Sequence, residues 1–313
     1  MVLPRISVVI PTFNQSGYLA EALDSVLTQT FADYEIIVVD DGSTDGTASL
    51  LRTYGDRIRV ISQDNRGAGA ARNRGLETAC GRYIAFLDHD DIWHPDKLKV
   101  QYEFMVAHPA AVGCSVPYSF SNAAWKPAFD LRIRGDDGIV AGALQRYGEG
   151  HMFVLSSIMM IDALKVGDLR YEVDKDSIDD VALLIRLLLR GPYGIAGDAP
   201  LATYRIHASN SSNSAHRLLK GIEGLRSIER SNGFGPSAPR DRDAINSRLS
   251  AIGRSTLMAQ AALGLRARAL RGYIAELPHQ LRARRFRFLF LFLLALAVPT
   301  RLLNRMGRFD VND

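Results

Sequence analysis

The 313-residue chain contains two cysteines and two tryptophans. The cysteines, Cys80 and Cys114, are too few for the multiple-disulfide framework of a small secreted domain, and they fit a reducing compartment. The N-terminus does not show the order of a secretory signal, which is a basic region, a long apolar run and a small-residue cleavage site. We therefore expect a cytoplasmic protein. With 47% hydrophobic and 23% charged residues, the composition excludes a disordered chain and suits one large domain with an appendage, or two domains.

Charge is unevenly divided along the sequence. Residues 1–214 contain 20 Lys and Arg against 27 Asp and Glu, whereas residues 215–313 contain 18 against 7. Together with the alternation of strand-like and helix-like periods described below, this division predicts an α/β domain over residues 1–212 and a helical, Arg-rich extension over residues 213–313. A strongly basic extension favours an anionic partner, either a lipid surface or a nucleic acid.

Long hydrophobic runs are scarce as well. Residues 288–300 form a stretch of 13 without charge, which is too short to span a bilayer, since that takes about 20 apolar residues. Phe and Leu between flanking arginines are typical of a helix lying in an anionic membrane surface, and a core or subunit-interface helix is the alternative. No nucleic-acid-binding motif accompanies the charge, so we favour the membrane and expect no nucleic acid.

Strand-like and helix-like periods alternate in the first hundred residues. Runs rich in β-branched residues predict four strands, at residues 6–10, 35–39, 58–62 and 83–87. The segments between them have helical spacing, and the connections are short. This alternation is typical of an α/β fold with a mostly parallel sheet and helices on both faces.

The ends of these strands carry the candidate site residues, because such sheets bind ligands at the carboxyl ends of their strands. The candidates are Pro11, Thr12 and Asn14 after the first strand, Asp40 and Asp41 after the second, and Asp88, Asp90 and Asp91 after the fourth. Five carboxylates at one edge repel one another, which indicates a cation or a ligand rich in hydrogen-bond donors.

Asp88 and Asp90 form an Asp-x-Asp pattern directly after a predicted strand. Two carboxylates at this spacing are suited to share one Mg²⁺ or Mn²⁺ while the metal also binds a diphosphate. Capping of the helix after Pro95 is the alternative. Asp40 and Asp41 are suited to accept hydrogen bonds from a nucleobase or ribose, or to form a turn.

Residues 67–72, Gly-Ala-Gly-Ala-Ala-Arg, superficially resemble a dinucleotide-binding fingerprint. They follow the third predicted strand instead of the first, and Arg72 stands where a small residue is needed. An NAD-dependent enzyme is therefore disfavoured. Arg72, near the start of a helix, is suited instead to bind a phosphate or a base.

Two further motifs lie downstream. Asp179 and Asp180 begin a predicted amphipathic helix, either as a capping pair or with one of them as a general base for a hydroxyl. His207 ends the sequence Tyr-Arg-Ile-His after a strand-like stretch, and it is a candidate phosphate contact or metal ligand. An ordinary structural histidine is the alternative.

In this order the motifs resemble those of the family 2 glycosyltransferases, which have the GT-A fold. The resemblance covers about residues 6–211. It rests on Ser7-Val-Val-Ile-Pro-Thr-Phe-Asn14, Val38-Val-Asp-Asp-Gly-Ser-Thr-Asp45, Asn65-Arg-Gly67 with Ala71-Arg-Asn73, Phe86-Leu-Asp-His-Asp-Asp-Ile-Trp93, Asp179-Asp180 and Tyr204-Arg-Ile-His207.

The resemblance implies an inverting, metal-assisted transfer from a nucleotide-sugar to a hydroxyl of a glycan or lipid-linked acceptor. It further implies surface polysaccharide synthesis at the inner face of the cell membrane. Asp180 would be the general base, next to Asp179 where the family usually has Glu, and Asp88 and Asp90 would hold Mg²⁺ or Mn²⁺. The residues expected to bind the nucleotide-sugar are Pro11, Thr12, Asn14, Asp40, Asp41, Arg72, Asp88 and His207.

Two other functions are compatible with carboxylates on such a sheet. A nucleotidyltransferase would need a basic, glycine-rich phosphate loop after the first strand, where this chain has Pro-Thr-Phe-Asn. A non-catalytic nucleotide-sugar sensor or membrane scaffold of the same fold would not need Asp88, Asp90 and Asp180 together. Both functions are alternatives to the transferase, and the residues just named disfavour them.

Overall fold

The computed structural model describes residues 3–121, 131–173, 179–207, 210, 215–262, 264–286, 288, 292–293 and 296. The chain divides into two compact units. One consists of Met1–Ala143 and Met152–Ala208, and the other of Leu144–His151 and Ser209–Asp313. The boundary that we predict, between residues 212 and 213, lies outside the described residues.

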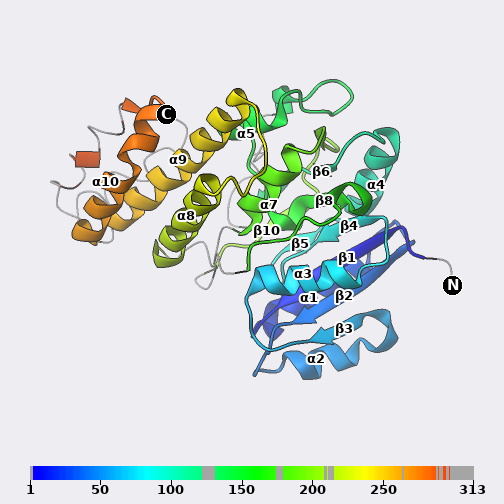
Figure 1. Cartoon of the computed structure of the whole chain (residues 1–313). Helices are drawn as coiled ribbons and strands as arrows, with labels where there is room; N and C mark the ends of the chain where they lie inside the picture. The colour runs from blue at the N-terminus through cyan, green and yellow to red at the C-terminus, as the bar shows by residue number, and fades with distance from the viewer. Residues whose placement is uncertain are drawn as a thin grey trace. The chain divides into compact units, whose positions relative to one another are not determined.

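A seven-stranded sheet in the order β3-β2-β1-β4-β8-β6-β9 forms the centre of the first unit (Figure 1). Its strands are β1 (Ile6–Thr12), β2 (Tyr34–Asp40), β3 (Arg59–Ser62), β4 (Tyr83–Phe86), β6 (Gly113–Ser115), β8 (Met159–Asp162) and β9 (Tyr193–Ile195). The first four strands are mutually parallel, and β8 runs antiparallel to β4 and β6. The predicted mostly parallel sheet is confirmed.

Helices cover both faces of this sheet. They are α1 (Ser16–Leu27), α2 (Thr47–Thr53), α3 (Ala68–Thr78), α4 (Lys97–Ala107), α6 (Ala163–Val166) and α7 (Asp179–Leu188). Every residue of β1 is buried, as are the last five of β2, because strands covered on both faces bury both sets of side chains. The sheet thereby holds the ends of β1, β2 and β4 in fixed positions at one edge.

A second sheet places another segment beside the end of β4. Its strands are β5 (Ile92–Trp93), β10 (Ala202–Tyr204) and β7 (Tyr118–Phe120). β10 pairs antiparallel with β5, with Ala202 opposite Trp93. Because antiparallel strands run in opposite directions, the residues that follow β10 lie beside those that precede β5.

The second unit is helical. It contains α8 (Ala215–Arg230), α9 (Pro239–Ala262) and α10 (Arg266–Arg282), together with most of α5 (Ala143–Glu149). Arg226 of α8 is buried and donates two hydrogen bonds to Glu276 of α10, at 3.0 and 2.8 Å. It also donates to Asn246 and Ser250 of α9, so one guanidinium group links the three helices.

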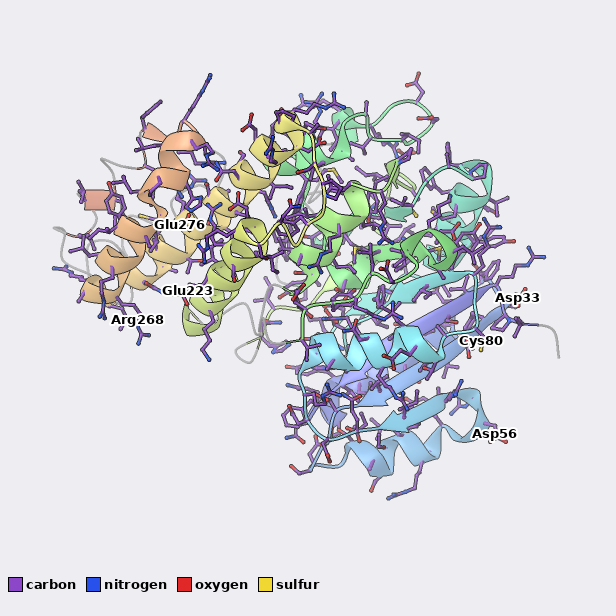
Figure 2. The ribbon with its side chains drawn as sticks, viewed as in Figure 1. Asp33, Asp56, Cys80, Glu223, Arg268 and Glu276 are labelled. Carbon is purple, nitrogen blue, oxygen red and sulfur yellow. The ribbon has the colours of Figure 1, made fainter. Side chains whose placement is uncertain are left out.

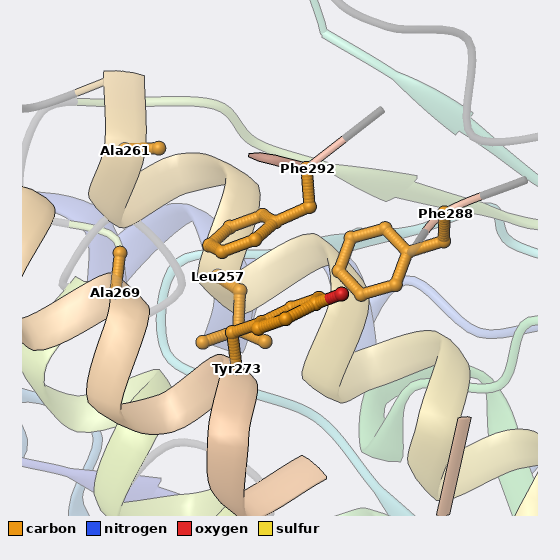
Figure 3. Packing of buried hydrophobic residues seen from close by; sticks show 6 residues of the cluster. All are labelled: Leu257, Ala261, Ala269, Tyr273, Phe288 and Phe292. Carbon is orange, nitrogen blue, oxygen red and sulfur yellow. The ribbon is translucent and has the colours of Figure 1, made fainter. Parts of the chain in front are cut away.

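Most of the predicted membrane-surface segment, residues 288–300, lies outside the described residues. Phe288 and Phe292 are described, and both are buried (Figure 3). The ring of Phe292 stacks on that of Tyr273, with 4.7 Å between centroids. The other members of this hydrophobic cluster are Leu257, Ala261 and Ala269. At Phe288 and Phe292 the side chains therefore belong to the core of the helical unit.

Across the described part of the chain, no helix combines the length and the apolar character that a membrane span requires.

Candidate active site

The carboxyl ends of β1 and β2 lie side by side. Thr12 is opposite Asp40 in the parallel register, and the N–H of Asp41 donates to the carbonyl of Thr12 at 2.9 Å. Thr12 and both aspartates are buried, as is Pro11. The hydroxyl of Thr12 is buried and has no hydrogen-bond partner within the described structure. The structure therefore brings these four candidates together.

Asn14 is exposed and lies at the turn that follows β1. Its side-chain oxygen accepts a hydrogen bond from the N–H of Thr44 at 2.7 Å, and its own N–H donates to Ser43 Oγ at 2.9 Å. Asn14 thus links the turn after β1 to the turn after β2. A direct contact with the nucleotide-sugar stays a prediction.

Asp41 organises the loop that leads into α3. One of its oxygens accepts hydrogen bonds from Gln63 Nε2 and from the N–H of Arg66, and the other from the N–H of Gly67 at 2.7 Å. Gly67 has a φ of +88°, a conformation that glycine adopts without steric cost. Asp41 thereby fixes the start of α3. Its predicted bond to a nucleobase is not tested by this arrangement.

Arg72 of α3 is the buried centre of the site. It donates to Asp179 Oδ2 at 2.9 Å and to Asp88 Oδ1 at 2.5 Å, and its guanidinium carbon lies 5.2 Å from the ring centroid of Tyr171. Burial alone lowers the pKa of Arg72, but the two carboxylates raise it well above its ordinary value. Arg72 is therefore a permanent cation that connects the end of β4 to the start of α7.

Small side chains allow α3 to come this close. A Cβ atom on Gly69 would lie 2.5 Å from the carbonyl oxygen of Glu172. One turn further, Asn73 donates to the carbonyl of Tyr171 at 3.0 Å and accepts from its N–H at 2.8 Å. Tyr171 is thus held under Arg72. Tyr171 was not among the residues predicted from the sequence, although Asn73, which holds it, belongs to the motif Ala71-Arg-Asn73.

Asp179 and Asp180 begin α7 and interact strongly with each other. Burial raises the pKa of Asp180 to about 7; the carboxylates of Asp179 and Asp88 also raise it, while Arg72 lowers it. Burial likewise raises the pKa of Asp179, against the lowering effect of Arg72. Because Asp179 bonds to Arg72 at 2.9 Å, Asp180 is the member of the pair with the stronger basic character.

Asp90 lies beside the segment that follows β10. Its Oδ2 is 3.0 Å from Nε2 of His207, whose ring stacks on Tyr18 with 4.7 Å between centroids. The backbone carbonyl of Asp90 accepts from Arg205 Nε, and Asp91 accepts from the N–H of Arg205 at 3.1 Å. Neither Asp90 nor Asp91 caps α4, because the N-cap position of that helix is occupied by Asp96. The antiparallel pairing of β5 and β10 explains this arrangement.

Ser157 is a site residue that the sequence analysis did not find. It is buried, and its hydroxyl accepts a hydrogen bond from the N–H of Asp88 at 3.0 Å. Its carbonyl accepts from Trp93 Nε1 at 2.8 Å. Ser157 therefore positions the beginning of the Asp88–Asp91 loop. No local pattern around Ser157 distinguishes it from other serines.

The acidic loop fits a metal ion that is shared with a substrate. Within the described residues, no group of three or more His, Cys, Asp or Glu side chains is arranged to hold a metal ion. Mg²⁺ is usually bound by one or two carboxylates together with substrate phosphates, and not by a complete protein cage. Asp88 and Asp90, both partly exposed, are carboxylates of the kind suited to such a shared site, and their role as metal ligands stays a prediction.

A Rossmann-like sheet with carboxylates at its strand ends and an acidic pair opening a later helix defines the GT-A class of glycosyltransferases. Residues 7–161 match the model of glycosyl transferase family 2. The chain is also 36% identical over 233 residues to TuaG of Bacillus subtilis, a glycosyltransferase provisionally assigned to teichuronic acid biosynthesis. This match covers 72% of the chain and 89% of TuaG. The chain belongs to glycosyl transferase family 2.

Other relatives match over shorter segments. Glycosyltransferase GlyA of Streptococcus pneumoniae is 37% identical over 139 residues, which are 44% of this chain and 20% of GlyA. An uncharacterized glycosyltransferase of Rickettsia prowazekii is 41% identical over 102 residues, or 33% of this chain and 32% of the relative. These names agree with the predicted enzyme class and not with a non-catalytic scaffold or a nucleotidyltransferase.

Solved structures confirm the GT-A fold. TarS 1–349 of S. aureus in complex with UDP-GlcNAc superimposes with a TM-score of 0.59 at 19% identity, covering 90% of this chain and 91% of TarS 1–349. The mannosyltransferase PcManGT of Pyrobaculum calidifontis, in complex with GDP-Man and Mn²⁺, gives 0.58 at 18% identity, covering 95% and 88%.

Proposed function

We propose that this family 2 glycosyltransferase moves a sugar from a nucleotide-diphosphate sugar to an acceptor hydroxyl in one displacement, with inversion at the anomeric carbon. The observation that carries the proposal is the ion-paired group formed by buried Arg72 and Asp179 with the partly exposed Asp88, next to Asp180 in sequence. The raised pKa of Asp180, to which the carboxylate of Asp88 contributes, supports a base close to the proposed diphosphate loop.

Asp180 is the proposed general base. It takes the proton of the acceptor hydroxyl as the acceptor oxygen forms its bond to the anomeric carbon, and the bond from that carbon to the diphosphate oxygen breaks. An ordinary aspartate, with a pKa of about 3.9, is a weak base at neutral pH. Burial raises the pKa of Asp180 to about 7, where proton affinity and the fraction of free base are balanced.

Asp88 and Asp90 are the proposed ligands of Mg²⁺ or Mn²⁺. When bound, such a cation neutralises the charge that develops on the leaving nucleoside diphosphate. The salt bridge from Arg72 holds Asp88 in place, and His207 lies against Asp90. That PcManGT is bound to GDP-Man and Mn²⁺ supports this assignment.

The donor is a nucleotide-sugar, as in the structures of TarS with UDP-GlcNAc and PcManGT with GDP-Man. Its nucleotide is bound by the strand ends around Pro11, Thr12, Asp40 and Asp41, with Asn14, Arg72 and His207 contributing. Because TuaG is assigned to teichuronic acid biosynthesis, we propose a glycan or lipid-linked acceptor in cell-surface polysaccharide synthesis. The proposed location is the cytoplasmic face of the cell membrane.

A release assay for nucleoside diphosphate tests the proposal. The protein is incubated with UDP-, GDP- and dTDP-sugars, with and without Mn²⁺, and donor binding is measured in parallel. We expect release from one donor that depends on the metal and is lost in Asp90→Ala.

Asp168→Ala is the matched control, because this exposed carboxylate pairs only with Arg190 on the surface among the described contacts. Release that is independent of metal, or equal in Asp90→Ala, would contradict the metal assignment. Failure to bind any donor would contradict the transferase itself.

A further inference from the structure

The outward face of α10 carries an apolar stripe. Leu270, Ile274 and Leu281 are spaced by four and seven residues, which places them on one side of a helix. Their exposed fractions are 41%, 61% and 45%. The buried face of α10 lies next to this stripe, about 100° around the helix, and consists of Ala269, Tyr273, Glu276 and Gln280. In the part of the chain that the structure describes, α10 therefore has a buried face and, beside it, an apolar stripe that is exposed.

The exposed charges that α10 itself carries have one sign. Four arginines of α10 are exposed, and Figure 2 labels one of them, Arg268; the others are Arg266, Arg271 and Arg282. The helix has a single acidic residue, Glu276, which is buried and paired with Arg226. The exposed surface of α10 consequently presents positive charge and apolar side chains together.

Isolated exposed leucines are common on proteins, but an aligned row of three between arginines is not a scattered feature. A basic surface alone fits any polyanion, and an apolar stripe alone fits another protein. A bilayer with anionic headgroups satisfies both, because apolar side chains enter the acyl boundary while guanidinium groups bind phosphates.

We propose that α10 is the surface through which the protein binds an anionic lipid bilayer, with Leu270, Ile274 and Leu281 inserted below the headgroups. This moves the membrane contact away from Phe288 and Phe292, which are core residues. Phe286, after α10, is exposed and extends the apolar surface in sequence. The assignment concerns the helical unit by itself and does not depend on the proposed transfer reaction.

Vesicle sedimentation of the full chain tests the surface. The probes are phosphatidylcholine vesicles and vesicles that also contain about 30% phosphatidylglycerol. We expect the wild-type protein to sediment with the anionic vesicles and to be released by salt. The double variant Ile274→Asp/Leu281→Asp should lose about tenfold or more in partition coefficient, because charged side chains cannot enter the acyl boundary. Arg271→Glu/Arg282→Glu should lose about 25-fold or more, since each arginine near an anionic surface contributes about fivefold.

Leu164→Asp is the matched control, because Leu164 is 78% exposed but belongs to the first unit. In a gain variant, Ile274→Trp, the emission in excess of that of Trp93 and Trp125 in the wild-type protein should shift to the blue when anionic vesicles are added, since Trp favours the interface. Unchanged sedimentation of the aspartate variant with no blue shift in the tryptophan variant would overturn the proposal. So would wild-type protein that ignores anionic vesicles. Nucleoside diphosphate release without vesicles reports on the proposed reaction separately.

Discussion

At the scale of single residues, the carboxylate pair at the start of α7 shows how neighbours set chemistry. Asp179 is bound by Arg72, so its charge is neutralised locally. Burial raises the pKa of Asp180, and repulsion from the carboxylate of Asp179 raises it further. Two adjacent residues of the same type therefore have different electrostatic surroundings.

Replacing the proposed base tests this assignment. Asp180→Asn should lower turnover by about 10²–10⁴-fold, because the amide cannot accept the proton of the acceptor hydroxyl. Donor affinity should remain nearly unchanged, because Asp88 and Asp90 stay in place. The measurement combines sugar transfer rates with donor titration, with Asp168→Asn as control. Full turnover in Asp180→Asn would refute the role of Asp180 as the base.

The same pair predicts a pH dependence. Since the base must be deprotonated, kcat/KM should fall about tenfold per unit below pH 7 and level off above it. Asp179→Asn removes a carboxylate that raises the pKa of Asp180, so the acid limb should move to lower pH. Asp179→Glu retains the charge and should leave the limb in place. A limb that does not move in Asp179→Asn would show that another group titrates.

At the scale of elements, the helical unit depends on a buried ion network. Arg226 of α8 reaches Glu276 of α10, and it also bonds to Asn246 and Ser250 of α9. α9 and α10 approach closely here: a Cβ atom on Gly253 would lie 2.9 Å from Glu276 Oε2. Such a network fixes the register of the three helices because every partner must be satisfied at once.

Arg226→Ala should therefore destabilise the helical unit by about 3–5 kcal/mol, since Glu276 would be left buried without its partner. The double variant Arg226→Met/Glu276→Leu should recover part of that loss, because Glu276 is no longer buried without a partner, while Glu229, which also pairs with Arg226, stays partly exposed. Hydrogen exchange of α8, α9 and α10 measures the effect. Arg268→Ala, on the exposed side of α10, should change little; equal losses in the single and double variants would exclude the pairing as the cause.

At the scale of the whole molecule, buried ionisable groups make stability depend on pH. Lys97 is fully buried, its Nζ donates to Gln101 at 2.7 Å, and it lies 3.7 Å from the ring centroid of Trp93. Burial lowers the pKa of Lys97 to about 7. Above pH 7 the unfolded lysine keeps a proton that the folded one has lost, so the free energy of unfolding should rise with pH.

The expected slope from pH 7 to about 8.5 is at most about 1.4 kcal/mol per unit. At higher pH, Cys114 opposes it: burial raises the pKa of that thiol to about 12, and the unfolded thiol ionises first. Urea unfolding of the first unit, followed by tryptophan fluorescence from Trp93 and Trp125, which both belong to this unit, measures the slope. It should vanish in Lys97→Met and persist in Lys99→Met, where the lysine is exposed. A slope unchanged in Lys97→Met would assign it to another group.

The alternation of periods along the sequence determined the strands and their parallel arrangement. Buried β-branched runs form strands, and short connections through helices allow only parallel neighbours. Once the strands were predicted, the positions of the carboxyl ends of β1, β2 and β4 in the sequence were predicted with them. Thr12, Asp40 and Asp88 were found as candidates for this reason. The acidic pair at residues 179–180 was visible because it opens an amphipathic helix. These features depend on residues that are close in sequence.

Only the tertiary structure decided which of these residues meet. Arg72 and Asp179 are 107 positions apart, and Asp90 and His207 are 117 apart. Their contacts depend on strand order and on the register of β5 with β10, which no local period contains. Tertiary packing likewise decided which apolar side chains of the helical unit are covered, because it buried Phe288 and left Ile274 exposed. Amphipathic spacing specifies that a face is apolar, whereas the assembled fold determines which apolar face is covered.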